Sequence, residues 1–131
     1  MSDPVADFLT RIRNAAQRRH AQLQCQGSLI RQEIAEVLKR EGFIQHWEAT
    51  HSEDGKPLLN VSLKFDKQGA SAIRGIKRIS TPGLRRYRGY RELKQVWNGQ
   101  GIAILTTSKG VFTDAQCREQ KLGGEVICEV W

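Results

Sequence analysis

Towards its C-terminal end the chain carries the run Gly101-Ile102-Ala103-Ile104-Leu105-Thr106-Thr107-Ser108-Lys109-Gly110, an apolar stem that ends in a polar tip. The apolar half predicts a buried strand, and a helix is expected to begin within 111–114, so the tip would join a strand to a helix. Three hydroxyls, a lysine and a glycine offer hydrogen-bond donors, acceptors, one cation and accessible backbone N–H groups. This chemistry suits a surface rich in phosphate and ribose, although the same residue types also fill ordinary turns.

The residues around this run predict a β-rich C-terminal lobe over 72–131. Short strands are expected around 76–79 and 84–87, separated by the turn Thr81-Pro82-Gly83. The other expected elements of this lobe are one or two helical turns within 90–97, a short helix over 114–122 and a last strand over 125–131.

The first part of the chain predicts an α/β lobe over 1–67. Pro4 suits the first position of a helix, and Ser28 suits the N-cap of a second helix that ends before Gly42. A strand beginning at Phe43, a hairpin turn over 51–56 and an alternating strand over 59–65 complete the lobe. The expected fold is therefore α+β with two small lobes: two helices on a short sheet, then a β-rich lobe with one short helix.

The charge of the chain is concentrated in its second half. The 131 residues carry a formal net charge of +7. Residues 1–66 hold nine Lys/Arg and nine Asp/Glu, whereas residues 67–94 hold nine Lys/Arg and one Asp/Glu, a net charge of +8 in 28 residues. Such a block attracts a polyanion such as nucleic acid, although a solvated basic face would look the same in sequence.

Several classes of function find little support in the residues. Three widely spaced cysteines and three histidines form no zinc motif, so neither a metal nor another cofactor is expected. No apolar run approaches the roughly 20 residues that span a bilayer, and the start does not resemble a signal peptide. We therefore expect no membrane partner and a cytoplasmic location, with synthesis inside an organelle left open. A small enzyme using Ser108 or Cys117 remains the alternative outside the binding class.

The polar residues suit RNA binding better than they suit catalysis. Double-stranded RNA is recognised through its shape, its 2′-hydroxyls and its phosphates. The hydroxyls of Thr106, Thr107 and Ser108 suit ribose and base edges, and Lys109 suits a phosphate. Tyr87, which follows Arg85 and Arg86, could stack on a base or pack in the core. Glu125 could accept hydrogen bonds from base amino groups, or be an ordinary exposed residue at the end of a strand.

Four stretches of the chain, in order, resemble one protein family. They are its opening, a central motif with Tyr87, the signature around the polar tip and a closing segment: Asp3-Pro4-Val5-Ala6-Asp7-Phe8-Leu9-Thr10-Arg11-Ile12-Arg13-Asn14-Ala15, Ser80-Thr81-Pro82-Gly83-Leu84-Arg85, Gly101-Ile102-Ala103-Ile104-Leu105-Thr106-Thr107-Ser108-Lys109-Gly110-Val111 and Gly123-Gly124-Glu125-Val126. On these motifs the chain resembles the bacterial type of the small-subunit ribosomal protein eight family.

The resemblance implies a non-catalytic, primary rRNA-binding protein that contacts the central domain of 16S rRNA and helps assemble the platform of the small subunit. Neighbouring small-subunit proteins are implied partners. Carried over by motif, the RNA contacts are Thr106, Thr107, Ser108, Lys109, Gly110, Tyr87, Gly124 and Glu125, with Arg11, Arg13 and Asn14 as a second contact. Arg85 and Arg86 are expected to contact RNA as part of the basic block. A free translational repressor that binds a structured mRNA, such as the message of its own operon, remains the alternative within the binding class.

Overall fold

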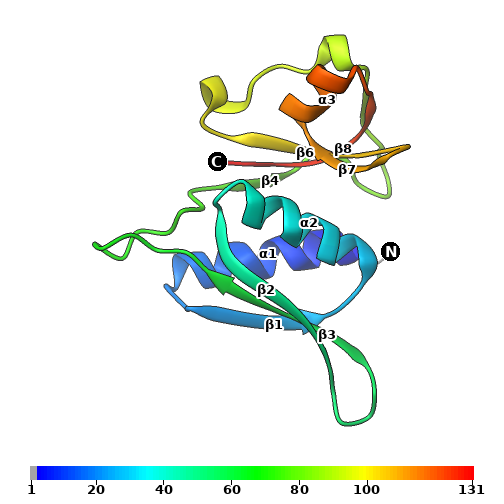
Figure 1. Ribbon diagram of the computed structural model, residues 1–131. Helices are drawn as coiled ribbons and strands as arrows, with labels where there is room; N and C mark the ends of the chain where they lie inside the picture. The colour runs from blue at the N-terminus through cyan, green and yellow to red at the C-terminus, as the bar shows by residue number, and fades with distance from the viewer. Residues whose placement is uncertain (1–2) are drawn as a thin grey trace. The chain divides into compact units, whose positions relative to one another are not determined.

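The computed structural model describes residues 3–131, which divide into two compact units, Pro4–Ile73 and Arg74–Trp131 together with Asp3 (Figure 1). The elements confirm the expected α+β class. In chain order they are α1 (Pro4–Gln17), β1 (Gln22–Gln26), α2 (Leu29–Arg40), β2 (Ile44–His51), β3 (Pro57–Leu63), β4 (Ile76–Arg78), β5 (Tyr87–Arg88), the 3-10 helices η1 (Tyr90–Glu92) and η2 (Val96–Gly99), β6 (Ile102–Thr107), β7 (Gly110–Thr113), α3 (Asp114–Gln120) and β8 (Gly124–Val130).

The Pro4–Ile73 unit places two helices on one face of an antiparallel sheet with strand order β1-β3-β2 (Figure 1). α2 begins where the sequence predicts, because the Ser28 hydroxyl accepts the backbone N–H of Arg31 at 3.3 Å. Phe8 and Ile12 of α1 and Ile34 of α2 are fully buried. Gly42 after α2 has a φ of +81°, which glycine adopts without steric cost.

The Arg74–Trp131 unit is built on a second antiparallel sheet with strand order β4-β8-β6-β7, in which β5 also pairs with β8. α3 lies against β6 and β7 (Figure 1). Five buried residues form a core beside this helix: Val96, Ala103, Leu105, Cys117 and Val126. β8 carries one extra residue at Ile127, because Ile104 pairs with Cys128 whereas Leu105 pairs with Val126.

The expected junction between a strand and a helix at the polar tip is wrong. The tip is the turn of a β-hairpin, and the chain returns along β6 as β7 before α3 begins. The reason lies in Gly110, whose φ of +131° favours glycine, and in Thr113, whose hydroxyl accepts the backbone N–H of Gln116 and so caps the helix. Val111 and Thr113 are buried and alternate with half-buried neighbours, which is the period of a strand.

Two other boundaries differ from the sequence prediction. The expected strand over 84–87 is reduced to the two residues of β5, because Leu84 closes a tight turn with Thr81 through two backbone hydrogen bonds of 3.1 Å. The last helix ends at Gln120 because Lys121 turns into the left-handed region with a φ of +56°.

Candidate nucleic-acid interface

Three of the predicted site residues form a row across the second sheet. Thr106 of β6 lies opposite Glu125 of β8, and Glu125 lies opposite Tyr87 of β5. Directly opposed residues of antiparallel strands place their side chains on the same face, with Cβ atoms about 4.5–5.5 Å apart. The Tyr87 side chain is 65 % exposed. A hydroxyl, a carboxylate and a phenol ring therefore stand side by side next to the hairpin turn.

The polar groups of the hairpin turn are of two kinds, those that bond within the turn and those that are free. The Thr107 hydroxyl donates to the Gly110 carbonyl at 2.8 Å and accepts the backbone N–H of Lys109 at 3.1 Å, so it holds the turn together. Ser108 and Lys109 are exposed, and within residues 3–131 neither side chain has a hydrogen-bond or ion-pair partner. The turn thus presents one hydroxyl and one ammonium group to a ligand.

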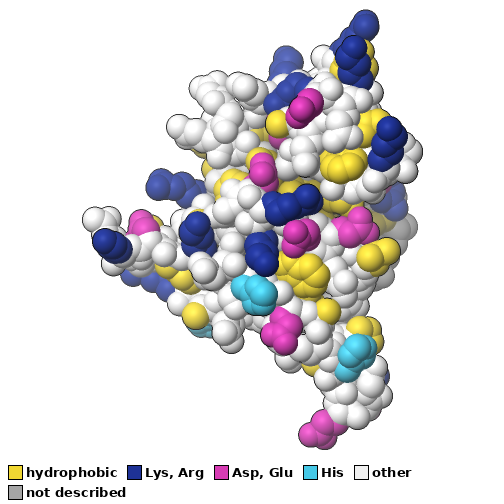
Figure 2. Space-filling view, in the orientation of Figure 1, with side chains coloured by type: hydrophobic (Ala, Val, Ile, Leu, Met, Phe, Trp, Pro, Cys, Tyr) yellow, Lys and Arg dark blue, Asp and Glu magenta, His cyan; other side chains and the backbone are white. Residues whose placement is uncertain are grey.

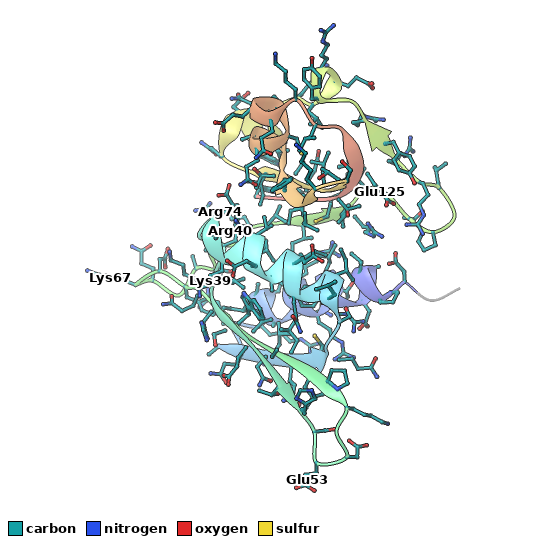
Figure 3. All side chains as sticks on the ribbon, turned by 45° about the vertical axis from the view of Figure 1, so that its right-hand side comes forward. Lys39, Arg40, Glu53, Lys67, Arg74 and Glu125 are labelled. Carbon is teal, nitrogen blue, oxygen red and sulfur yellow. The ribbon has the colours of Figure 1, made fainter. Side chains whose placement is uncertain are left out.

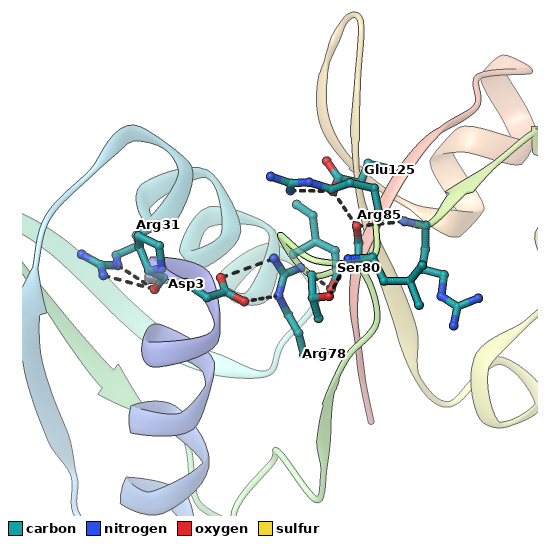
Figure 4. Close-up of polar contacts among 11 residues, drawn as sticks. Asp3, Arg31, Arg78, Ser80, Arg85 and Glu125 are labelled. Atoms are coloured by element: carbon teal, nitrogen blue, oxygen red, sulfur yellow. Dashed lines mark hydrogen bonds and ion pairs between the residues drawn. The ribbon is translucent and has the colours of Figure 1, made fainter. Parts of the chain in front are cut away.

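Glu125 is held by two side chains (Figure 4). Its Oε2 atom accepts the Ser80 hydroxyl at 2.5 Å and the Arg85 Nη1 at 2.9 Å. Burial raises the pKa of the Glu125 carboxyl, but these two hydrogen bonds and the charges of Arg85 and Arg78 outweigh it, and the net pKa lies below its usual value. Glu125 is therefore ionised at neutral pH, with Oε1 left to accept from a ligand.

Ser80 is the important residue that sequence reasoning missed. Its side chain is fully buried, and besides donating to Glu125 its oxygen accepts the backbone N–H of Arg86 at 3.0 Å. One hydroxyl thus fixes both the carboxylate and the backbone at Arg86, directly before β5. The sequence offered one signal for this role, the position of Ser80 at the start of the central motif. Without that motif, a serine next to a Thr-Pro-Gly turn is interpreted as a turn residue.

The pair Gly123-Gly124 allows three backbone segments to approach closely. A Cβ atom on Gly124 would lie 2.3 Å from the Thr106 carbonyl oxygen and 3.1 Å from the Thr107 Cγ2. A Cβ atom on Gly123 would lie 2.8 Å from the Arg88 carbonyl oxygen. Gly124 therefore has a packing role that sets the distance between β8 and the base of the hairpin turn.

Exposed cations flank Tyr87 of this row in sequence. Arg85, Arg86 and Arg88 are all exposed, and Arg85 alone among them is ion-paired within residues 3–131. Residues 74–131 contain eleven Lys/Arg and five Asp/Glu, so this unit carries most of the net positive charge. Lys and Arg side chains project from the surface of the unit that carries α3 (Figure 2), and Glu125 is seen at the start of β8 (Figure 3).

The remaining predicted contacts lie on α1, in the Pro4–Ile73 unit. Arg11 forms an exposed ion pair with Asp7 at 3.0 Å. Asn14 is exposed, and Arg13 is half-buried. These three residues therefore belong to a different unit from the hairpin turn.

The thiols of Cys117 and Cys128 are free and buried. Cys117 is fully buried, and burial and the charge of Asp114 raise the pKa of its thiol, with a smaller opposing effect from Arg118. Burial raises the pKa of the Cys128 thiol to about 12. Since the thiolate is the nucleophile, Cys117 is not suited to nucleophilic catalysis. Among residues 3–131, no three His, Cys, Asp or Glu side chains are placed to hold a metal ion.

No helix within residues 3–131 is both long and apolar enough to cross a membrane.

The fold and this surface define a class of protein: a two-unit α+β protein whose second unit gathers hydroxyls, an ionised carboxylate, an exposed aromatic ring and cations at one end of a basic sheet. The family model described as Ribosomal protein S8 matches residues 3–131. The chain belongs to this family.

Curated relatives agree over the whole length. The chain is 48 % identical over 131 residues to the small ribosomal subunit protein uS8 of Acidobacterium capsulatum and 50 % identical over 131 residues to that of Streptococcus sanguinis. It is 52 % identical over 132 residues to the uS8 protein of Exiguobacterium sibiricum. Each comparison covers 100 % of this chain and 98 % of the relative.

Proposed function

We propose that this protein is a non-catalytic constituent of the small ribosomal subunit that binds the central domain of 16S rRNA directly and helps assemble the platform. The observation that carries the proposal is the row Thr106–Glu125–Tyr87 beside the hairpin turn, in a chain of the S8 family. We further propose that the lobe over 72–131 supplies the main RNA contact, on ribosomes in the cytoplasm and beside neighbouring small-subunit proteins.

The structure suggests how the residues share this work. Ser108 and Lys109 project from the turn, so Ser108 would bond ribose or a base edge and Lys109 would hold a phosphate. Thr107 and Gly110 would act mainly by shaping the turn, since Thr107 already bonds the Gly110 carbonyl. Gly124 would act through its close packing against Thr106.

The other predicted contacts complete the surface. Glu125 would accept from a base amino group or a 2′-hydroxyl through Oε1, next to Thr106, while the exposed Tyr87 ring would stack on an unpaired base. Arg85 and Arg86 would supply attraction that does not depend on RNA sequence. A second, weaker contact is proposed for Arg11, Arg13 and Asn14 on α1.

Filter binding to an RNA fragment that carries the central-domain helix tests these roles. Lys109→Ala is expected to weaken binding and to flatten the plot of log affinity against log salt by about one unit, because one phosphate contact is lost. Ser108→Ala is expected to cost about 0.5–1.5 kcal/mol of binding free energy with the salt slope unchanged, because one neutral hydrogen bond is lost.

Lys39→Ala serves as the matched control, since Lys39 is an exposed lysine in the last turn of α2 (Figure 3). Its affinity and salt slope should equal those of the unmodified protein. Equal affinity of the unmodified protein for any duplex of the same length would refute shape-specific recognition.

A further inference from the structure

Trp97 presents an aromatic ring to solvent at the far end of β6 from the hairpin turn. It precedes β6, is 60 % exposed, and stacks on Trp131 with ring centroids 5.2 Å apart and an interplanar angle of 22°. One face of the Trp97 ring is therefore covered by Trp131, which leaves the other face open for stacking.

The Trp131 ring of this stack is fixed by the backbone around it. The Trp131 carbonyl accepts the N–H groups of Arg74 and Gly75 at 2.6 and 3.0 Å, and its own N–H donates to the Gly75 carbonyl at 3.1 Å. A Cβ atom on Gly75 would lie 2.4 Å from the Trp131 ring, so the indole rests directly on the glycine. Trp131 is thus a rigid base on which Trp97 rests.

The chain adopts an unfavourable conformation to present Trp97. Trp97 and Asn98 have φ angles of +49° and +54°, and Gly99 follows at +88°. Only the glycine adopts the left-handed region without steric cost. Such backbone outliers cluster at functional sites, where the surrounding structure maintains them. Here the turn is held by the buried Val96, whose carbonyl accepts the Gly101 N–H at 3.0 Å.

We propose that the open face of Trp97 stacks an unpaired RNA base, which forms a second RNA contact of the Arg74–Trp131 unit. The exposed amides of Gln95, Asn98 and Gln100 flank the ring in sequence, and amides donate to and accept from base edges. Base stacking on an aromatic ring tolerates any base identity, because every base has a flat face.

The surroundings favour RNA over a protein partner. The exposed Arg74 and Lys94 place positive charge in the segments that lead to the two stacked rings. A protein anchor normally sits at the centre of an apolar patch. The other large exposed hydrophobic residues among those described, Leu29, Leu84 and Tyr87, belong to other segments.

The structure also gives the separation of the two proposed RNA contacts. Trp131, on which Trp97 stacks, follows Val130, which pairs with Ile102 at the start of β6. The hairpin turn follows the other end of this six-residue strand, whose length is about 17 Å at 3.3–3.4 Å per residue step. This contact rests on the proposed RNA-binding function. The stacked base would be an unpaired nucleotide at some distance from the structured RNA helix that the hairpin turn would bind.

The test uses the full-length protein and a labelled single-stranded oligoadenylate as the probe. Binding is measured by the fluorescence anisotropy of this labelled RNA. Trp97→Ala is expected to weaken oligoadenylate binding by about 5- to 150-fold, the fold-change that corresponds to one stacked base. The slope of log affinity against log salt should stay constant, since no charge is removed. Trp97→Phe should retain most of the affinity, because it keeps a flat ring.

Trp47→Phe is the matched control. Trp47 lies in the other unit, where its indole N–H donates to Glu36 at 2.9 Å, so its replacement should leave oligoadenylate binding unchanged. Unchanged affinity in Trp97→Ala, or equal losses in Trp97→Phe and Trp97→Ala, would overturn the proposal. So would a Trp97→Ala protein that keeps its affinity for oligoadenylate but no longer retains other small-subunit proteins, since that result would make Trp97 a protein anchor.

Failure of this contact and failure of the proposed function give different results. If the unmodified protein does not bind the central-domain helix but still binds oligoadenylate through Trp97, the proposed function fails and the stacking contact stands. If the helix binds normally and Trp97→Ala leaves oligoadenylate affinity unchanged, only the stacking contact fails.

Discussion

Gly124→Ala is expected to lower the free energy of unfolding by about 1–3 kcal/mol, the usual cost of forcing an extra methyl group into a packed site. The new Cβ would lie 2.3 Å from the Thr106 carbonyl oxygen, which belongs to the backbone and cannot rotate away as a side chain does. β8 and β6 must separate to admit it. Because Thr106 is followed directly by the hairpin turn, the same shift should displace Ser108 and Lys109 and reduce RNA affinity.

Urea unfolding and filter binding measure these two effects. The matched control is Gly83→Ala, because a Cβ atom at Gly83 has no neighbour within 4 Å and its φ lies outside the left-handed region. This control should change stability by no more than about 0.5 kcal/mol. A Gly124→Ala protein as stable and as tightly binding as the control would show that β8 and the turn are not closely packed.

Glu125→Ala is expected to cost about 1–3 kcal/mol of unfolding free energy, because it leaves a buried hydroxyl without its acceptor. The Ser80 side chain is fully buried, and its hydroxyl donates to Glu125. Arg85 would lose its ion-pair partner as well. Glu125→Gln should cost less, since an amide oxygen can still accept the Ser80 hydroxyl. Chemical denaturation of each variant gives the comparison.

Glu119→Ala provides the control for this series, because Glu119 is an exposed carboxylate on α3 of the same unit. Its effect should stay within about 0.5 kcal/mol. If Glu125→Ala is no more destabilising than Glu119→Ala, the bonds from Ser80 and Arg85 do not stabilise the fold.

The pH dependence of stability should separate the charge of Glu125 from its shape. The folded-state pKa lies below the ordinary value of 4.5, so the ionised carboxylate stabilises the folded protein fully above that value. This contribution should be lost as the pH falls from about 4.5 through the lowered pKa. The stability difference between the unmodified protein and Glu125→Gln should therefore be constant near neutral pH and shrink in acid. A difference that stays constant into acid would contradict this role.

The helices and the class of fold were predictable because their signals are local. Ser28 caps α2, and Phe8, Leu9 and Ile12 repeat at the spacing of one helical face, so neighbouring residues determine both elements. β7 was missed because its four residues are too few to show a period and because Thr113 also reads as the start of a helix.

The site was only partly predictable, because its arrangement depends on strand register. Tyr87, Thr106 and Glu125 are far apart in sequence and become neighbours only through pairing with β8. That pairing includes an extra residue at Ile127, which sequence alternation does not reveal. The roles of Ser80 and Gly124 follow from the same close approach of strands.

We propose that direct contact with rRNA holds this protein in the small ribosomal subunit. Co-sedimentation with isolated small subunits after a stringent salt wash tests it most directly, with a Ser108→Ala, Lys109→Ala double variant run in parallel. We expect the unmodified protein to remain with the subunits and the double variant to be released at lower salt. Recovery of the unmodified protein in the soluble fraction, as expected of a free translational repressor, would contradict the claim.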